Sequence, residues 1–249
     1  MASTPLDERT PLAGPPPGKV RTTHPRRVGV GEAHERNASA YAELAATIKG
    51  MGLMSRRPGW YLARCLLLLA AYIVGFVALF TLGSSPWQLL VAAYFAVLFT
   101  QTAFLAHDGA HKQIFTSGSR NEWFSRVVGN LLVGLSYGWW MNKHSRHHAN
   151  PNKMGKDGDI KPGAIVFTTE DASRHHGWRA AVMSKQHWFF FPILTLAGAD
   201  LHVNAVKAVL GGEPVKARGV EAALRAIRLI GYPVLVQLAA GPLKGHAFM

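Results

Sequence analysis

The chain has 249 residues, of which 49% are hydrophobic and only 16% are charged, whereas about a quarter of the residues in a soluble domain carry charge. This composition excludes an ordinary soluble fold and predicts a membrane protein. The single cysteine, Cys65, excludes a disulfide framework, a four-cysteine cluster and a Cys-X-X-Cys redox pair within one chain. The net charge of +13 comes without a basic stripe interleaved with aromatic residues, so no nucleic-acid partner is expected.

Residues 1–36 are rich in Pro, Gly, Arg and Thr and lack apolar periodicity. They are expected to form a disordered tail, not a cleaved signal peptide. The remainder, residues 37–249, is expected to form one membrane domain. Near its start, the segment 39–53 is expected to form an amphipathic helix on the membrane surface. The apolar face of this helix consists of Tyr41, Leu44, Ala45 and Ile48.

Two long apolar runs follow, Cys65–Leu82 and Trp87–Ala106. As helices they reach about 27 and 30 Å, enough to cross the hydrocarbon core of a bilayer. Only four residues, 83–86, separate them, which predicts a tight helical hairpin. Lys and Arg outnumber Asp and Glu by 10 to 5 in residues 1–64 and by 11 to 6 in residues 107–187. The positive-inside rule therefore places both flanks of the hairpin in the cytoplasm.

Three later apolar segments are shorter. Val127–Met141 is interrupted by glycine and polar residues, which favours an interfacial or buried helix over a span. Trp188–Ala199 is shorter still and contains Pro192, and Leu229–Leu243 is a marginal third span. The predicted fold is therefore an all-α integral membrane protein, with a transmembrane helical hairpin and further cytoplasmic or interfacial helices.

Histidines gather directly after two of these apolar segments. His107 and His111 form H-D-G-A-H after the second span, and His144, His147 and His148 form H-S-R-H-H after Met141. On a helix, residues i, i+3 and i+4 share one face, so each motif directs its imidazoles to one point. Neutral imidazoles without cysteine or dense carboxylates suit iron, zinc or copper.

In a chain with 12 histidines, chance supplies the two-histidine pattern about 0.6 times and the three-histidine pattern about 0.03 times. The H-S-R-H-H motif is therefore the stronger signal. The alternative is that these histidines bond lipid headgroups or cap helix ends, which suits any one of them better than all five together.

The order of a hydrophobic hairpin, H-D-G-A-H and W-W-M-N-K-H-S-R-H-H-A-N-P-N resembles the integral-membrane fatty acid desaturases over residues 40–249, particularly the bacterial acyl-lipid or acyl-CoA type. The resemblance implies a di-iron site on the cytoplasmic side of a bacterial plasma membrane. With dioxygen, such a site removes two hydrogens from an acyl chain. The resemblance implies as metal ligands the five histidines of the two boxes, His107, His111, His144, His147 and His148.

The resemblance also implies partners: a membrane lipid or acyl-CoA as substrate, and an electron donor. No Gly-X-Gly-X-X-Gly motif or four-cysteine cluster is present, so the donor is expected to be a separate ferredoxin, cytochrome or flavin reductase. Asp108 is expected either to accept a hydrogen bond from an imidazole or to be an exposed helix-end charge. Phe104, Trp139 and Trp140 are expected either to line an acyl slot or to anchor the interface.

The sequence departs from the family pattern after the second box. It lacks the further Asn/His segment, the fourth span and the third histidine box. His246 would lie across the membrane from the two boxes if 229–243 spans, and His175, His176, His187 and His202 match no box. Two metals need about eight or nine ligands, so the chain is expected to be a truncated, inactive form. His202 is the best-placed spare ligand.

Two alternative functions remain open. One is a related di-iron membrane hydroxylase or ketolase, which would place the substrate differently after the first hydrogen is removed. The other is a non-catalytic membrane protein that binds metal. In cells that express the chain, unsaturated lipids would indicate a desaturase, hydroxylated lipids a hydroxylase, and unchanged lipids a non-catalytic protein.

Overall fold

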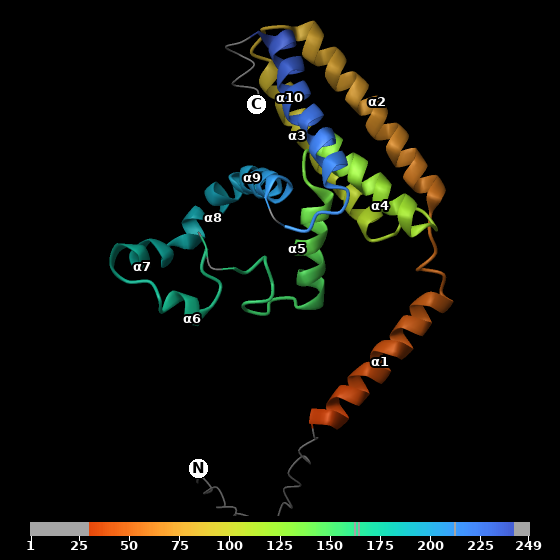
Figure 1. The fold of residues 1–249 in the computed structure, drawn as a ribbon, viewed down its shortest axis with the longest axis vertical. Coiled ribbons are helices and arrows are strands. Elements are labelled where there is room, and N and C mark those ends of the chain that lie inside the picture. The colour runs from red at the N-terminus through yellow and green to blue at the C-terminus, as the bar shows by residue number, and fades with distance from the viewer. Residues whose placement is uncertain (1–29, 162, 164, 212, 242–249) are drawn as a thin grey trace, which may run out of the picture. The chain divides into compact units, whose positions relative to one another are not determined.

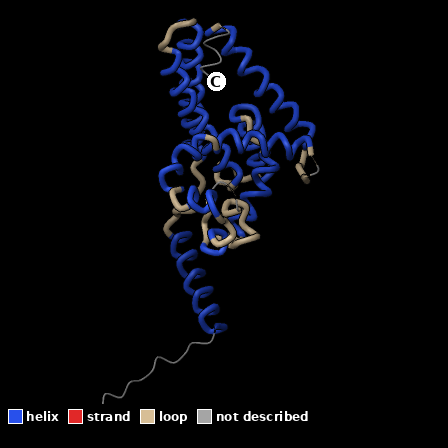
Figure 2. Tube along the Cα trace, turned by 90° about the vertical axis from the view of Figure 1, so that its left-hand side faces the viewer, coloured by secondary structure: helices blue, strands red, loops and turns tan. Residues whose placement is uncertain are grey.

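The computed structural model describes residues 30–161, 163, 165–211 and 213–241, and in this part of the chain every regular element is a helix (Figures 1 and 2). The helices are α1 (Val30–Gly50), α2 (Pro58–Leu82), α3 (Gln88–Ala110), α4 (Gly118–Val127), the π-helix η1 (Val128–Val133), α5 (Tyr137–Ala149), α6 (Thr169–Ala172), α7 (Gly177–Met183), α8 (Gln186–Thr195), α9 (Ala197–Leu210) and α10 (Arg218–Ala240). The chain divides into two compact units, residues 1–55 and 56–249.

The described part of the first unit is α1 and the turn that follows it. Helix α1 confirms a helix over most of the segment 39–53, with Tyr41 and Leu44 exposed. It begins at Val30, so residues 30–36 are helical where the sequence predicted a disordered tail. The rest of that predicted tail, residues 1–29, lies outside the described residues.

The predicted transmembrane hairpin is confirmed as α2 and α3. Its tight connection is closed by Gln88, whose side-chain amide donates to the carbonyl oxygens of Leu79 and Gly83, both at 2.7 Å. These bonds satisfy carbonyls that the end of α2 leaves without a helical partner. Close packing of the two helices depends on Gly75, where an added Cβ would lie 3.0 Å from the ring of Phe95.

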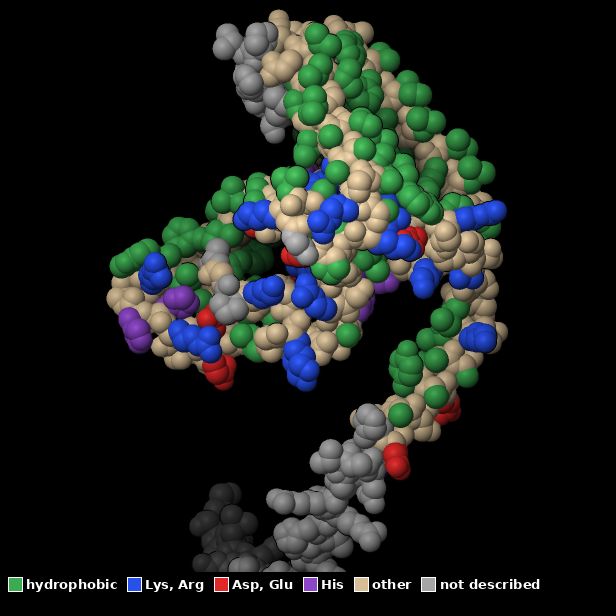
Figure 3. All heavy atoms as spheres, in the orientation of Figure 1, with side chains coloured by type: hydrophobic (Ala, Val, Ile, Leu, Met, Phe, Trp, Pro, Cys, Tyr) green, Lys and Arg blue, Asp and Glu red, His purple; other side chains and the backbone are tan. Residues whose placement is uncertain are grey.

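Helix α10 provides the third candidate span, so the described residues include three long apolar helices, consistent with an integral membrane protein. Val236 of α10 packs with Leu79, Val91 and Phe95 in the core of the hairpin. Hydrophobic side chains cover the visible faces of α2 and α10, as expected for helices in contact with lipid (Figure 3). The helix begins at Arg218, well before the segment 229–243 that the sequence suggested.

Helices α8 and α9 meet at Leu196 with a bend of 57°, and together they are long and apolar enough to count as a broken span or a re-entrant pair. The segment Trp188–Ala199 on its own is too short for this, as the sequence indicated.

The segment 127–141 does not form a span. Helix α4 continues into η1, which ends at Gly134 with a φ of 90°. This left-handed conformation suits glycine, and it lets the chain turn before α5 begins. The buried Asn130 and Ser136 confirm that this segment is an interior element of the protein.

Candidate metal centre

The two histidine motifs lie on neighbouring helix ends. His107 occupies the last turn of α3 and His111 is the residue after its end, whereas the other three histidines lie on α5. Helix α5 is capped by Ser136, whose hydroxyl accepts from the backbone N–H of Trp139 at 3.2 Å. This cap satisfies a backbone donor that the helix itself leaves unpaired.

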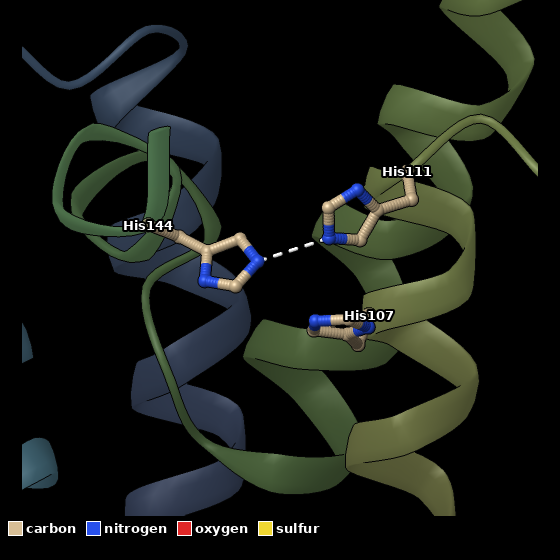
Figure 4. A group of neighbouring side chains, drawn as sticks. All are labelled: His107, His111 and His144. Carbon is tan, nitrogen blue, oxygen red and sulfur yellow. Dashed lines mark hydrogen bonds between the residues drawn. The ribbon is translucent and has the colours of Figure 1, made fainter. Parts of the chain in front are cut away.

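Four of the five predicted histidines converge. Nε2 of His144 lies 2.9 Å from Nε2 of His111 (Figure 4) and 3.0 Å from Nε2 of His148. One ring nitrogen of His107 lies within 4.8 Å of those of His111 and His144, and Figure 4 shows the three rings facing one another. The structure thus brings residues from two motifs, 33 positions apart, to one point.

These distances fit a transition-metal ion. Bonds from imidazole nitrogen to such a metal measure about 2.0–2.1 Å, so two ligands at right angles lie about 3.0 Å apart. The observed Nε2 separations of 2.9 and 3.0 Å match this spacing. Nε2 of His144 carries either one hydrogen or one lone pair, so it cannot form good hydrogen bonds to both neighbouring Nε2 atoms unless the protonation states of all three rings match. One metal cation, in contrast, accepts a lone pair from each of the three Nε2 atoms.

The electrostatics of the cluster favour neutral imidazoles. Burial, followed by the neighbouring imidazoles, lowers the pKa of His144 to about 4. Burial also lowers the pKa of His111, with smaller contributions from His107 and His148. At neutral pH His144 therefore carries a free lone pair, as metal binding requires.

His147 is oriented by carboxylates that the sequence analysis missed. Its Nδ1 lies 2.9 Å from Oδ2 of Asp157 and 3.2 Å from Oδ2 of Asp159. The side chain of Asp157 is fully buried and accepts from the backbone N–H groups of Asp159 at 2.9 Å and Asn152 at 2.8 Å. These bonds lower the pKa of Asp157, and the bond from the Asp159 amide contributes most. His147 therefore donates from Nδ1 and keeps Nε2 free.

The other polar candidates do not join the cluster. Oδ1 of Asp108 lies 3.9 Å from Nδ1 of His107, beyond hydrogen-bond range, and Oδ2 accepts from the hydroxyl of Tyr61 at 3.4 Å. The ring nitrogens of His202 lie 2.8 Å from the carbonyl oxygen of Gly198 and 3.3 Å from that of Val133. His202 lies against backbone carbonyls and is not part of the histidine cluster. His246 lies outside the described residues.

An apolar cavity of about 190 Å³ adjoins the cluster, and His107 belongs to both. Phe104 and Trp140 line this cavity, as the sequence suggested, and Trp140 also stacks on His144 with ring centroids 4.1 Å apart. Trp139 does not line it. Instead, Trp139 packs in a separate core with residues of α9, because it lies on another face of α5.

A buried ion pair fixes the start of α5. Glu221 of α10 accepts from the hydroxyl of Ser136 at 2.6 Å, from the backbone N–H of Gly138 at 3.0 Å and from Nε of Arg126 at 3.1 Å. The side chains of Glu221 and Arg126 are both buried. Sequence reasoning missed this network because its partners are 83 to 95 residues apart.

Comparison with known proteins identifies the family. A model of the fatty acid desaturase family matches residues 84–249. Delta(8)-fatty-acid desaturase 2 of Arabidopsis thaliana is 26% identical over 212 residues, covering 79% of this chain and 46% of the relative. Delta(5) fatty acid desaturase fat-4 of Caenorhabditis elegans is 28% identical over 164 residues, covering 64% and 36%.

A third relative, the acyl-lipid (9-3)-desaturase of Physcomitrium patens, is 34% identical over 113 residues, covering 43% of this chain and 22% of the relative. The chain spans less than half the length of these relatives. No solved structure matches. The family match covers most of the chain, including both histidine motifs, and the chain therefore belongs to the fatty acid desaturase family.

Proposed function

We propose that the chain carries the histidine-ligated iron centre of an enzyme that uses dioxygen to introduce a double bond into an acyl chain. The observation that carries this proposal is the position of His107, which belongs both to the convergent histidine cluster and to the wall of an apolar cavity. This arrangement places a candidate metal beside a space that suits a hydrocarbon chain.

The proposed ligands are the five histidines of the two motifs. Four converge directly, and His147 presents Nε2 while Asp157 holds its Nδ1. Iron, when bound, supplies with dioxygen an oxidant able to attack a C–H bond that no acid or base side chain activates. An iron pair, as the family resemblance implies, needs about eight or nine ligands, so we propose that these 249 residues alone bind it incompletely.

The cavity residues have a separate role. Phe104 and Trp140 provide apolar contacts for methylene groups and exclude water from the space beside His107. Trp140 also supports the ring of His144 by stacking, so one side chain fixes both the acyl slot and a proposed ligand. We propose an acyl chain carried by a membrane lipid or acyl-CoA as the substrate. An acyl substrate agrees with the similarity to a fatty acid desaturase and an acyl-lipid desaturase.

We further propose that the histidine cluster lies on the cytoplasmic side of a bacterial plasma membrane. The excess of Lys and Arg in both flanks of the hairpin supports this orientation. A separate ferredoxin, cytochrome or flavin reductase would dock there as electron donor, guided by charge complementarity.

Photo-crosslinking tests the site without requiring turnover. Purified protein in nanodiscs is loaded with iron and labelled with a fatty acyl probe that carries a diazirine. We expect labelled peptides to contain Phe104 or Trp140. Labelling confined to the lipid-facing surface of α2 would contradict the proposal.

The reaction itself is tested in a chimera that adds the C-terminal segment of the Caenorhabditis elegans relative to this chain. Gas chromatography with mass spectrometry of host lipids should show a new double bond that His147→Ala abolishes. A hydroxylated product would favour a hydroxylase over a desaturase.

A further inference from the structure

A second apolar cavity, of about 470 Å³, lies among α2, α3, α4, η1 and α10. Thr102 and Leu105 of α3 line it, whereas Ala103, Ala106 and His107 line the cavity beside the histidines. The two cavities therefore lie on neighbouring faces of α3. Among the residues that line this second cavity, Arg228 is the one with a charged side chain.

The guanidinium of Arg228 lies between two aromatic rings. Its central carbon is 4.2 Å from the ring centroid of Phe99 and 4.0 Å from that of Tyr232. Such cation–π contacts hold the cation in place but leave its N–H donors without acceptors. The neighbouring Arg225 is different, because it donates to the carbonyl oxygens of Gly134 at 3.2 Å and His202 at 3.4 Å.

Within the described part of the chain, the Arg228 guanidinium makes neither a hydrogen bond nor an ion pair. A guanidinium has five N–H donors in a planar fork that matches a carboxylate or phosphate. A cation inside an apolar cavity is costly unless an anion pairs with it. The cavity therefore has the charge and the donors for an anionic group.

The depth of Arg228 indicates which anion reaches it. Phe99, which contacts Arg228, is two residues before Gln101, a rise of about 3 Å along α3. Gln101 accepts from Nη2 of Arg64 at 2.8 Å. From Arg64, the charge-free stretch Cys65–Leu82 extends about 27 Å, close to the thickness of the hydrocarbon core. Both arginines thus lie near one boundary of that core, where lipid phosphates are found.

We propose that this cavity binds one anionic phospholipid, whose phosphate pairs with Arg228. Arginine and phosphate form bidentate, charge-assisted hydrogen bonds. The lipid chains would lie along Leu69, Ile73 and Leu132, which are at least 39% exposed although they line the cavity. The lipid would join α2, η1 and α10 at one point. Its lining shares no residue with the cavity beside His107, and the test does not require catalysis.

Thermal unfolding of the purified chain in detergent tests this site, with native mass spectrometry to count retained lipids. Phosphatidylglycerol should raise the midpoint and leave one lipid bound. Phosphatidylcholine should act more weakly, and neither diacylglycerol nor inorganic phosphate should act. If diacylglycerol stabilised the protein equally, the lipid phosphate would have no role in binding. If inorganic phosphate stabilised it equally, the site would bind a free anion and not a lipid.

Matched arginine variants complete the test. Arg228→Gln should raise the phosphatidylglycerol concentration needed for half-maximal stabilisation by about tenfold, as expected for the loss of a charged hydrogen bond. Arg64→Gln should leave it unchanged, because Gln101 already occupies that guanidinium. If Arg228→Gln does not fold, Arg228→Lys should show an intermediate loss of affinity for phosphatidylglycerol. A wild-type lipid response in the folded Arg228 variants would overturn the proposal.

Discussion

The buried carboxylate of Asp157 lies 2.9 Å from Nδ1 of His147, a half-buried residue of the second histidine motif. Two backbone amides hold the carboxylate, so the imidazole has one favourable orientation. Carboxylates that accept from the outer nitrogen of a ligating histidine fix its tautomer and raise its basicity. A residue outside both motifs thus determines what His147 is able to bind.

Asp157→Asn is expected to weaken iron binding by 10- to about 100-fold, because an amide oxygen accepts less strongly from the imidazole and no longer carries a charge. Asp200→Asn is the matched control, since Asp200 is an exposed carboxylate in the first turn of α9. Chelator competition on the purified protein measures both affinities. Equal affinities for Asp157→Asn and wild type would mean that this carboxylate does not support a ligand.

Glu221→Gln is expected to destabilise the protein by about 1–3 kcal/mol, because it removes the charge from a buried group that accepts three hydrogen bonds, whereas Arg126 keeps its contact with Glu122 at 2.8 Å. The double variant with Arg126→Met should recover part of this loss. Unfolding in detergent with increasing denaturant measures the free energies. A loss below about 1 kcal/mol would show that the pair is not a main support of α5.

Ala103→Phe is expected to fill the cavity beside His107 and to reduce acyl crosslinking to Trp140 at least tenfold, since Ala103 lines that space. Ala96→Phe, about two helical turns away on α3 and exposed, should leave crosslinking unchanged. Iron content should remain at the wild-type level in both variants. Undiminished crosslinking in a folded Ala103→Phe protein would place the acyl chain elsewhere.

The 249-residue chain expressed by itself with a competent electron donor is expected to produce no new double bonds in host lipids. Five histidines are fewer than the about eight or nine groups that two metals need. Gas chromatography against an empty-vector control measures the product. Monounsaturated lipid above the control would show that these histidines, with other groups of the chain, suffice.

Local patterns made the hairpin and the convergence of the histidines predictable. The α2–α3 connection is only a few residues long, and i, i+4 spacing places His107 and His111 on one face. The start of α10 was not predictable in this way, because the apolar run begins only after Arg225 and Arg228. The contacts of Arg225 with carbonyl oxygens and of Arg228 with aromatic rings depend on tertiary packing.

The sequence also did not show whether Trp139 or Trp140 lines the cavity beside the histidines. Neighbouring residues on α5 point in different directions, and only the position of α9 shows which indole is covered. Asp157 and Glu221 were missed for a similar reason. The Asp157 carboxylate is recognisable only when the loop after α5 folds back onto His147, and Glu221 only when α10 packs against Ser136.

Iron content of purified protein, measured by inductively coupled plasma mass spectrometry, tests the proposed metal centre most directly. His144 is the residue to change, because its Nε2 lies within 3.0 Å of two neighbouring Nε2 atoms. His144→Ala should lose at least nine-tenths of the bound iron while still inserting into membranes, because the apolar helices do not depend on metal. His187→Ala, an exposed histidine of α8, should retain wild-type iron. Wild-type iron in His144→Ala, or equal loss in both variants, would contradict a centre built on this cluster.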